Sequence, residues 1–214
     1  MARMPTHAVG LHEWGTQGIG AFSCLGQPPL VRVSLSAMPF KLAFMTVGIL
    51  REPVGHEQVQ GFVDRVSGVY QSADLSDGFQ ARSIRDMGTY LHSWGDVKLP
   101  VCYPQPMPNE RIASTLSLWA DLESVAAFSY YGVHGEALAK RREWFDKADL
   151  PVYVAWWVDA DHAIGWAEGC ERLDRLHRDG PTALAFNFAK PFDCEGKVCV
   201  LDREVVKAKA ARNA

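Results

Sequence analysis

His134 is the residue of this 214-residue chain whose type and position best suit chemistry. It opens the segment HGEALAKRREWF, a predicted helix that begins shortly after Gly132. An imidazole in this position can ligate haem iron, and it can also act as a general base near neutral pH. A helix cap or a structural hydrogen bond would explain the same histidine without any chemistry. The sequence leaves both interpretations open.

Arg141 shares the predicted helical stripe of His134, since it follows at i+7. A guanidinium there could pair with a haem propionate or with a substrate carboxylate in a bidentate fork. Arg142 lies off that stripe, and the Glu136/Lys140 pair indicates that part of the helix is simply a solvated face. We therefore predict Arg141, beside His134, as the anion anchor of a catalytic or cofactor site.

Aromatic residues gather in the second half of the chain and could fill a core or line an apolar pocket. Because neighbouring strand residues point to opposite faces, one of the adjacent pair at 156 and 157 should face the pocket and the other the core. Which of them does so is not determined by the sequence. The predicted pocket wall consists of Trp119, Trp144, Phe145, Trp156 and Trp157.

His162 follows a predicted strand in a turn, where it could reach the pocket mouth or cap the next helix. The surrounding residues 159–162 read DADH, a weak metal signal because no distant ligand accompanies it. Cys194 and Cys199 are too far apart for a CxxC pair. We predict no metal site, and the lack of HExxH, GxSxG, P-loop and GxGxxG motifs disfavours the enzyme classes that they mark.

Charge and cysteine content limit the partners and the compartment. The formal net charge is −3 and the pI is near 6.2, so we expect binding to neither nucleic acid nor an anionic membrane. Five scattered cysteines indicate reduced thiols, and the chain shows neither a signal peptide nor a run of about 20 apolar residues. These features predict a soluble, cytoplasmic protein.

The order of predicted elements indicates an α+β fold of the ferredoxin-like β-α-β-β-α-β type, with an extra C-terminal helix. Such a sheet leaves one face open, and two protomers commonly close it into a barrel, so a homodimer is expected. Alternation predicts strands at 40–49, 79–86, 111–119 and 151–158, and helical periods predict helices at 56–71, 121–132, 134–145 and 164–180.

The chain divides into three predicted parts. Residues 1–37 form an N-terminal extension without a clear period, residues 38–192 form the domain, and residues 193–214 form a C-terminal tail. Residues 88–110 are rich in proline and interrupt the domain. An insertion of this length is usually functional or disordered, and its aromatic residues favour a lid over a disordered loop.

Several segments resemble the bacterial domain-of-unknown-function family 3291. They are LSLW at 116–119, FSYYGVHGEALAKRREWF at 128–145, VAWWVDADH at 154–162, ERLDRLHRDGPTALAFNF at 171–188 and KPF at 190–192. The family usually carries Pro-Ala-Gly-His after its Trp-Trp-Val, and here Asp159-Ala160-Asp161-His162 stands there, with the histidine retained. The resemblance spans residues 40–192 and implies membership of the dimeric α/β barrel superfamily.

That superfamily includes cofactor-free antibiotic-biosynthesis monooxygenases, haem peroxidases, aldoxime dehydratases, isomerases and plain binding proteins. The resemblance therefore implies a small-molecule oxidoreductase, a haem-dependent or cofactor-free monooxygenase of specialised metabolism that acts on an apolar substrate. Two alternatives stay open. One is a non-catalytic small-molecule-binding barrel, and the other is a lyase, isomerase or dehydratase that uses His134 to transfer protons.

Overall fold

The structure is a computed structural model that describes residues 39–84, 92–147 and 149–213. These residues belong to one compact unit, which spans residues 36–214. The predicted N-terminal extension and the first residues of the predicted lid, up to residue 91, lie outside the described residues.

An antiparallel sheet of four strands forms the centre of the fold, in the order β2-β3-β1-β4. Met45 of the long central strand lies opposite Leu116 on one side and Val154 on the other. The alternation predicted from the sequence places these strands correctly, although β2 is shorter than expected. The strands are β1 (Phe40–Ile49), β2 (Phe79–Arg82), β3 (Ile112–Trp119) and β4 (Tyr153–Asp159).

Each region predicted to be helical contains helix, and together with the sheet this confirms the α+β class. Side-chain caps mark two of their starts: His56 accepts a hydrogen bond from the Gln58 amide, and Asp121 accepts one from the Ser124 amide at 2.7 Å. The helices are α1 (Glu57–Asp74), α2 (Leu122–Tyr130), α3 (Gly132–Ala139), α4 (Arg141–Trp144), α5 (Trp166–Asp179) and α6 (Arg203–Arg212), with a short 3₁₀ turn at Asn109–Arg111.

The single helix predicted at 134–145 is wrong, because the chain turns at Lys140 and forms α3 and α4 separately. The turn lets the end of α4 join β1: the Arg51 amide donates to the Trp144 carbonyl at 2.8 Å, and Phe145 pairs with Leu50. His134 and Arg141 consequently do not share one helical stripe.

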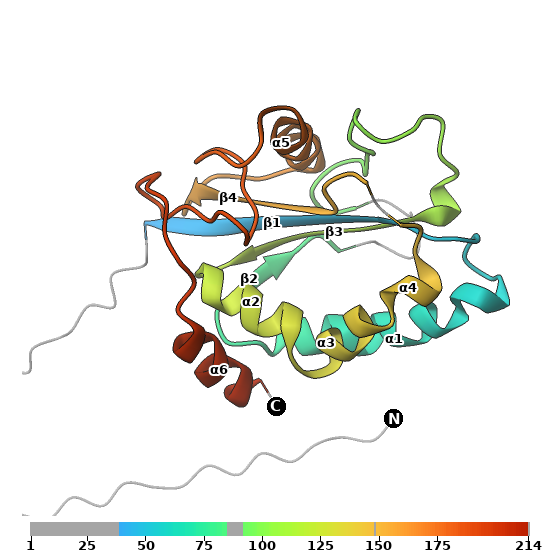
Figure 1. Cartoon of the computed structure of the whole chain (residues 1–214), viewed down its shortest axis with the longest axis horizontal. Coiled ribbons are helices and arrows are strands. Elements are labelled where there is room, and N and C mark those ends of the chain that lie inside the picture. The colour runs from blue at the N-terminus through green and yellow to red at the C-terminus, as the bar shows by residue number, and fades with distance from the viewer. Residues whose placement is uncertain (1–38, 85–91, 148, 214) are drawn as a thin grey trace, which may run out of the picture. The chain divides into compact units, whose positions relative to one another are not determined.

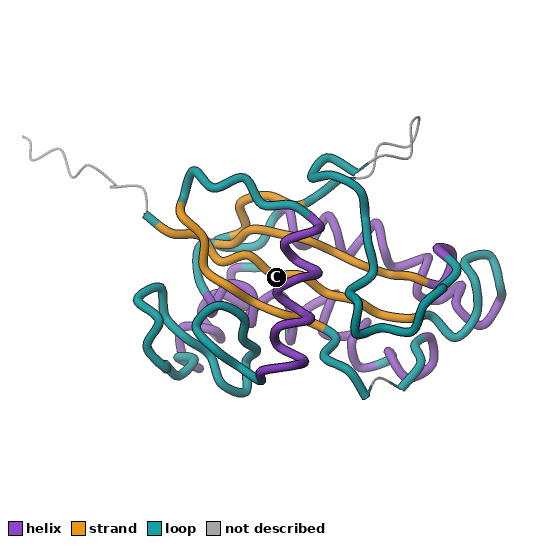
Figure 2. The backbone as a smooth tube through the Cα atoms, turned by 90° about the horizontal axis from the view of Figure 1, so that it is seen from above, coloured by secondary structure: helices purple, strands orange, loops and turns teal. Residues whose placement is uncertain are grey.

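The two faces of the sheet are covered by different elements. Helices α1 to α4 lie on one side of the sheet and α5 lies on the other (Figure 1). Seen from the α5 side, that helix runs across the strands (Figure 2). Alternate residues of β1 pack against opposite faces of the sheet. Ala43, Met45 and Val47 belong to the hydrophobic cluster that includes α5, whereas Leu42 and Phe44 belong to the cluster on the other face.

The sheet face that we expected to be open is therefore covered within the protomer. Helix α5 contributes a buried stripe at i, i+4, i+7 and i+10, formed by Trp166, Cys170, Leu173 and Leu176. The segment 92–105 packs beside this stripe, and the Tyr103 hydroxyl donates to the Pro151 carbonyl at 2.9 Å. Two protomers could close a barrel across this face only if α5 moved away from it. The homodimer therefore stays a prediction.

Residues 193–214 were expected to be a tail. They include helix α6, which packs on α2. Val206 is buried against Ala126 and Ala127, and the Lys209 ammonium lies 3.5 Å from Asp77 and 3.2 Å from Asp121. Residues 183–192, which follow α5, make isolated bridges, one of which pairs Phe186 with Ala155 of β4.

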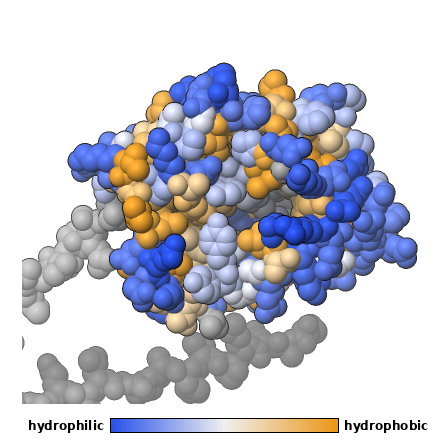
Figure 3. Space-filling model, viewed as in Figure 1, coloured by the Kyte–Doolittle hydropathy of each residue, from blue (hydrophilic) through white to orange (hydrophobic). Residues whose placement is uncertain are grey.

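Among the helices within the described ranges, none is both long and apolar enough to cross a bilayer. The face shown in Figure 3 intersperses small hydrophobic groups among hydrophilic residues.

Because α5 packs closely on β1, we predict that alanine changes the stability of the protein in opposite directions at two helical glycines. A methyl group at Gly169 would lie 2.5 Å from the fully buried Met45 sulfur, whereas one at Gly68 of α1 would meet nothing within 4 Å. Alanine is favoured in a helix interior by about 1 kcal/mol, but overpacking costs about 1–3 kcal/mol. Gly68→Ala should raise the melting temperature and Gly169→Ala should lower it, and a stabilising Gly169→Ala would contradict this packing.

Candidate functional site

A cavity of about 430 Å³ lies at the edge of the sheet, where β4 ends and β1 begins. Trp157 and Asp159 of β4 and Phe40 of β1 contribute to its wall, and His162 follows β4 into it. Glu168 and Arg172 come from α5, and the remainder of the wall comes from Val158, Ala183, Leu184 and residues 193–196. We refer to it as the His162 cavity.

His162 and Glu168 form a hydrogen-bonded pair in this cavity. The imidazole Nε2 lies 2.9 Å from the Glu168 Oε2, and the two side chains are 46% and 21% exposed. Because an ionised carboxylate can only accept, Nε2 carries the hydrogen, and in the neutral ring the lone pair is on Nδ1. Among the described residues Nδ1 has no hydrogen-bond partner, so it is available to a ligand.

Glu168 is held by two further donors that fix its position. The indole Nε1 of the fully buried Trp156 donates to Glu168 Oε1 at 3.0 Å, and the Arg172 guanidinium donates to the same oxygen at 3.0 Å. Partial burial favours the neutral acid, but the hydrogen bonds and positive charges of His162 and Arg172 outweigh it and lower the pKa of Glu168. Glu168 therefore remains a carboxylate at neutral pH.

This arrangement can transfer protons. A carboxylate behind an imidazole fixes its tautomer and orientation, and it stabilises the imidazolium that forms when the opposite nitrogen takes up a proton. Arg172 donates one hydrogen bond to Glu168 and one to the Leu184 carbonyl, and these two bonds fix its guanidinium beside the carboxylate. It holds the carboxylate in place.

The structure does not bring the predicted pocket residues together. Trp156 is buried beneath α5, whereas Trp119 is buried on the opposite side of the sheet. Trp144 and Phe145 belong to a third cluster, against Val59 of α1. The adjacent tryptophans face opposite sides as predicted, and of the predicted wall only Trp157 lines the His162 cavity, where it joins His162.

His134 lies in the first turn of α3, at the end of an aromatic series that runs through Phe79, Trp119 and Phe128. Its ring centroid lies 4.6 Å from that of Phe128, and its Nδ1 lies 2.8 Å from the Ser129 carbonyl oxygen. A carbonyl can only accept, so Nδ1 carries the hydrogen and Nε2 keeps the lone pair, without a hydrogen-bond partner among the described residues. Burial lowers the pKa of His134 and outweighs its hydrogen bond to Ser129, so the ring is neutral at pH 7.

Arg141 does not complete a site with His134. Its guanidinium donates to the Leu138 carbonyl at 2.9 Å and is exposed at the start of α4. The predicted indole walls are buried in separate clusters, and neither the His162 cavity nor the larger cavity described below is lined by His134. The described residues therefore do not bring the predicted indole walls together around His134.

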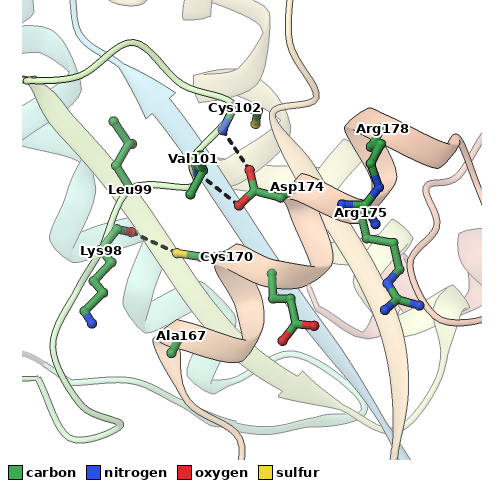
Figure 4. Close-up of a pocket in the computed structure, with 10 residues that line it drawn as sticks. Lys98, Leu99, Val101, Cys102, Ala167, Cys170, Asp174, Arg175 and Arg178 are labelled. Carbon is green, nitrogen blue, oxygen red and sulfur yellow. Dashed lines mark hydrogen bonds between the residues drawn. The ribbon is translucent and has the colours of Figure 1, made fainter.

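A larger cavity of about 620 Å³ lies between α5 and residues 98–102 (Figure 4). Both oxygens of Asp174 already accept backbone hydrogens there, from Val101 at 3.0 Å and Cys102 at 2.8 Å. Burial raises the pKa of the Cys102 thiol to about 12 and that of Cys170 to about 11. Both thiols are neutral and both oxygens of Asp174 accept hydrogen bonds, so none of these three groups is an activated nucleophile or base.

Glu168 and Arg172 are the site residues that sequence reasoning missed. Their i, i+4 spacing in the predicted helix was visible, but such pairs usually decorate solvated helix surfaces. Only the fold shows that His162 and Trp156 meet the same carboxylate. Among the described residues, no group of three or more His, Cys, Asp or Glu side chains is placed to hold a metal ion.

Comparison with known proteins identifies the family of this chain, but the matching descriptions name no activity. A family model described as "Domain of unknown function (DUF3291)" matches residues 41–200. A conserved protein from Methanosarcina mazei Go1 is similar in structure with a TM-score of 0.36 and 12% identity, over 56% of this chain and 93% of that chain. The NE2512 protein of unknown function from Nitrosomonas europaea gives 0.37 and 12%, over 59% and 94%. No curated protein matches.

The lowered pKa of Glu168 predicts a pH-dependent loss in Glu168→Gln. The unfolded chain binds this proton more readily, so the stabilisation is full above the ordinary glutamate pKa of 4.5 and disappears as the pH falls through the lower folded value. The variant should melt about 2–6 °C below the wild type at pH 7, and the difference should shrink as the pH falls below 4.5 and through the lower folded pKa of Glu168. A pH-independent gap would show that the charge of Glu168 is not involved.

The lowered pKa of His134 predicts that the wild type loses stability faster than His134→Gln as the pH falls through the range in which histidine titrates. Below the ordinary histidine pKa of 6.5 the unfolded chain takes up a proton that folded His134 refuses, so folding loses stability as the pH falls. The melting temperature of the wild type should therefore drop more steeply between pH 7.5 and 5.5 than that of His134→Gln. The exposed His177→Gln is the control and should keep the wild-type slope; an unchanged slope in His134→Gln would be inconsistent with a buried neutral ring.

Proposed function

This chain belongs to the DUF3291 family, whose description names no activity, and we propose from its geometry that it is a small-molecule enzyme that transfers protons in the His162 cavity. The observation that carries the proposal is the His162–Glu168 pair, 2.9 Å apart and braced by a buried indole. Of the classes predicted from the sequence, this pair favours the lyase, isomerase or dehydratase group. The proton-transfer residue is His162 in place of His134.

The proposed step is removal of a proton from a carbon or oxygen of the substrate. The substrate C–H or O–H bond breaks, its electron pair stays on the substrate, and a new N–H bond forms at His162 Nδ1. Glu168 stabilises the resulting imidazolium, and the same proton can return to another atom of the substrate. Trp157 and Phe40 supply apolar surface against which a small molecule can lie.

The sheet order supports the proposal that the domain is ferredoxin-like. Connections from β1 through α1 to β2, and from β3 through α2–α4 to β4, give the β-α-β-β-α-β order with β1 and β3 in the centre. Assignment to the dimeric α/β barrel superfamily is the proposal that goes with it. Since α5 covers the remaining face of the sheet, a homodimer would use a different surface of the protomer.

An oxidoreductase centred on His134 is the second candidate function. It is favoured by one observation: the ring is neutral, with Nδ1 bonded to the Ser129 carbonyl and Nε2 free. Haemin titration tests its haem-dependent form. A Soret band that appears with the wild type and is absent with His134→Ala would support this candidate, and no spectral change would remove haem from it.

Proton exchange in deuterated water distinguishes the two candidates. A panel of small ketones, with and without amino groups, is incubated with protein and followed by loss of the α-proton NMR signals. His162→Gln should slow the exchange of a turned-over compound by about 10²–10⁴-fold, and Glu168→Gln should slow it less. His134→Gln serves as the matched control and should exchange like the wild type. Loss of exchange in His134→Gln alone would transfer the function to His134.

A further inference from the structure

The His162 cavity is also defined by an uneven distribution of charge. Four carboxylates line it, from Asp159, Glu168, Asp193 and Glu195, and Arg172 is the one permanently cationic side chain among its lining residues. Each terminal nitrogen of Arg172 donates one hydrogen bond, one to Glu168 and the other to the Leu184 carbonyl. The charge of Arg172 is therefore paired with that of Glu168, and the lining carries three further carboxylates without a second permanent cation.

The four carboxylates are not equivalent. Glu168 is neutralised by Arg172 and His162, and Glu195 pairs with Lys197. Asp193 accepts the backbone hydrogens of Glu195 and Lys197 with its Oδ1, which shapes the loop. Asp159 makes no ion pair with any described residue, is exposed at the end of β4, and lines the same cavity as His162. Asp193 likewise makes no ion pair with a described residue, but Asp159 is the more exposed of the two, so we assign the ligand's contact to Asp159.

Aromatic surface accompanies this charge. Trp157 and Phe40 line the cavity, and the Trp157 indole nitrogen is occupied by the Phe192 carbonyl at 2.8 Å. The indole therefore offers its ring, not its N–H group, to a ligand. Aromatic faces and carboxylates together are the groups that attract ammonium ions, through cation–π contact and Coulomb attraction.

We infer that the substrate of the His162 cavity is a small organic amine bound in its protonated form. This inference rests on the proton-transfer function proposed above and adds the charge of the substrate to it. Asp159 binds the ammonium group, the rings of Trp157 and Phe40 contact the body of the ligand, and His162 Nδ1 takes the proton. The positive charge beside the reacting atom also makes that proton easier to remove.

Binding of three probes of nearly equal shape tests the inference: benzylammonium, benzyl alcohol and benzoate. NMR shifts of the labelled Trp157 indole report occupancy of the cavity at low salt. Benzylammonium should bind tightest and benzoate weakest, at least about tenfold apart, and salt should reduce the difference. Equal binding, a preference for benzoate, or no binding by any probe at millimolar concentration would overturn the inference.

Two variants locate the effect at Asp159. Asp159→Asn should weaken benzylammonium binding about fivefold and leave benzyl alcohol unchanged. Asp161→Asn removes a carboxylate two residues away that does not line the cavity, and it should bind all three probes like the wild type. Equal losses in the two variants would mean that the long-range net charge, not Asp159, attracts the cation.

His162→Gln separates this inference from the proposed function. It removes the base and keeps the carboxylates, so benzylammonium affinity should stay within about threefold of the wild type. Selective ammonium binding without proton exchange on any ligand would contradict the proposed function and leave the binding inference intact. Exchange confined to anionic compounds would support the function and overturn the inference.

Discussion

The packing of α5 against the sheet is the constraint on which the rest of the structure depends. Gly169 lets the helix approach the Met45 sulfur closely, and the buried stripe of Trp166, Leu173 and their neighbours then seals this face. The same contact sets where the polar side of α5 lies. Glu168 immediately precedes the close-contact glycine, so a packing requirement in the core also decides where the carboxylate of the proposed site stands.

Trp156 connects the core to the chemistry. Its ring is completely buried beneath α5, and its one polar atom reaches out to Glu168. A buried indole nitrogen without a partner would be costly, so satisfying it holds the carboxylate and, through the carboxylate, the imidazole of His162. Orientation of the proposed base therefore depends on a residue that no ligand could touch. Stability and site geometry are linked through a single hydrogen bond.

Neighbouring groups, not residue type, distinguish the candidate sites. Cys102 and Cys170 line the larger cavity, yet burial and the Asp174 carboxylate keep their thiols protonated. The His134 ring packs on Phe128, and among the described residues its one hydrogen-bond partner is the Ser129 carbonyl, so no ionised group supports its Nε2 as a base. His162 combines an accessible ring with an ionised partner, which is why the smaller cavity is the better candidate.

Periodicity alone determined the strands, most helices and the α+β class, because a strand or helix that buries one face repeats its apolar residues at a fixed spacing. It also showed that Trp156 and Trp157 face opposite ways. Tertiary packing decided the rest. The turn at Lys140 separates Arg141 from His134 because Phe145 pairs with Leu50, a partner distant in sequence. The meeting of His162, Glu168 and Trp156 likewise depends on how α5 crosses the sheet, and no local spacing encodes that crossing.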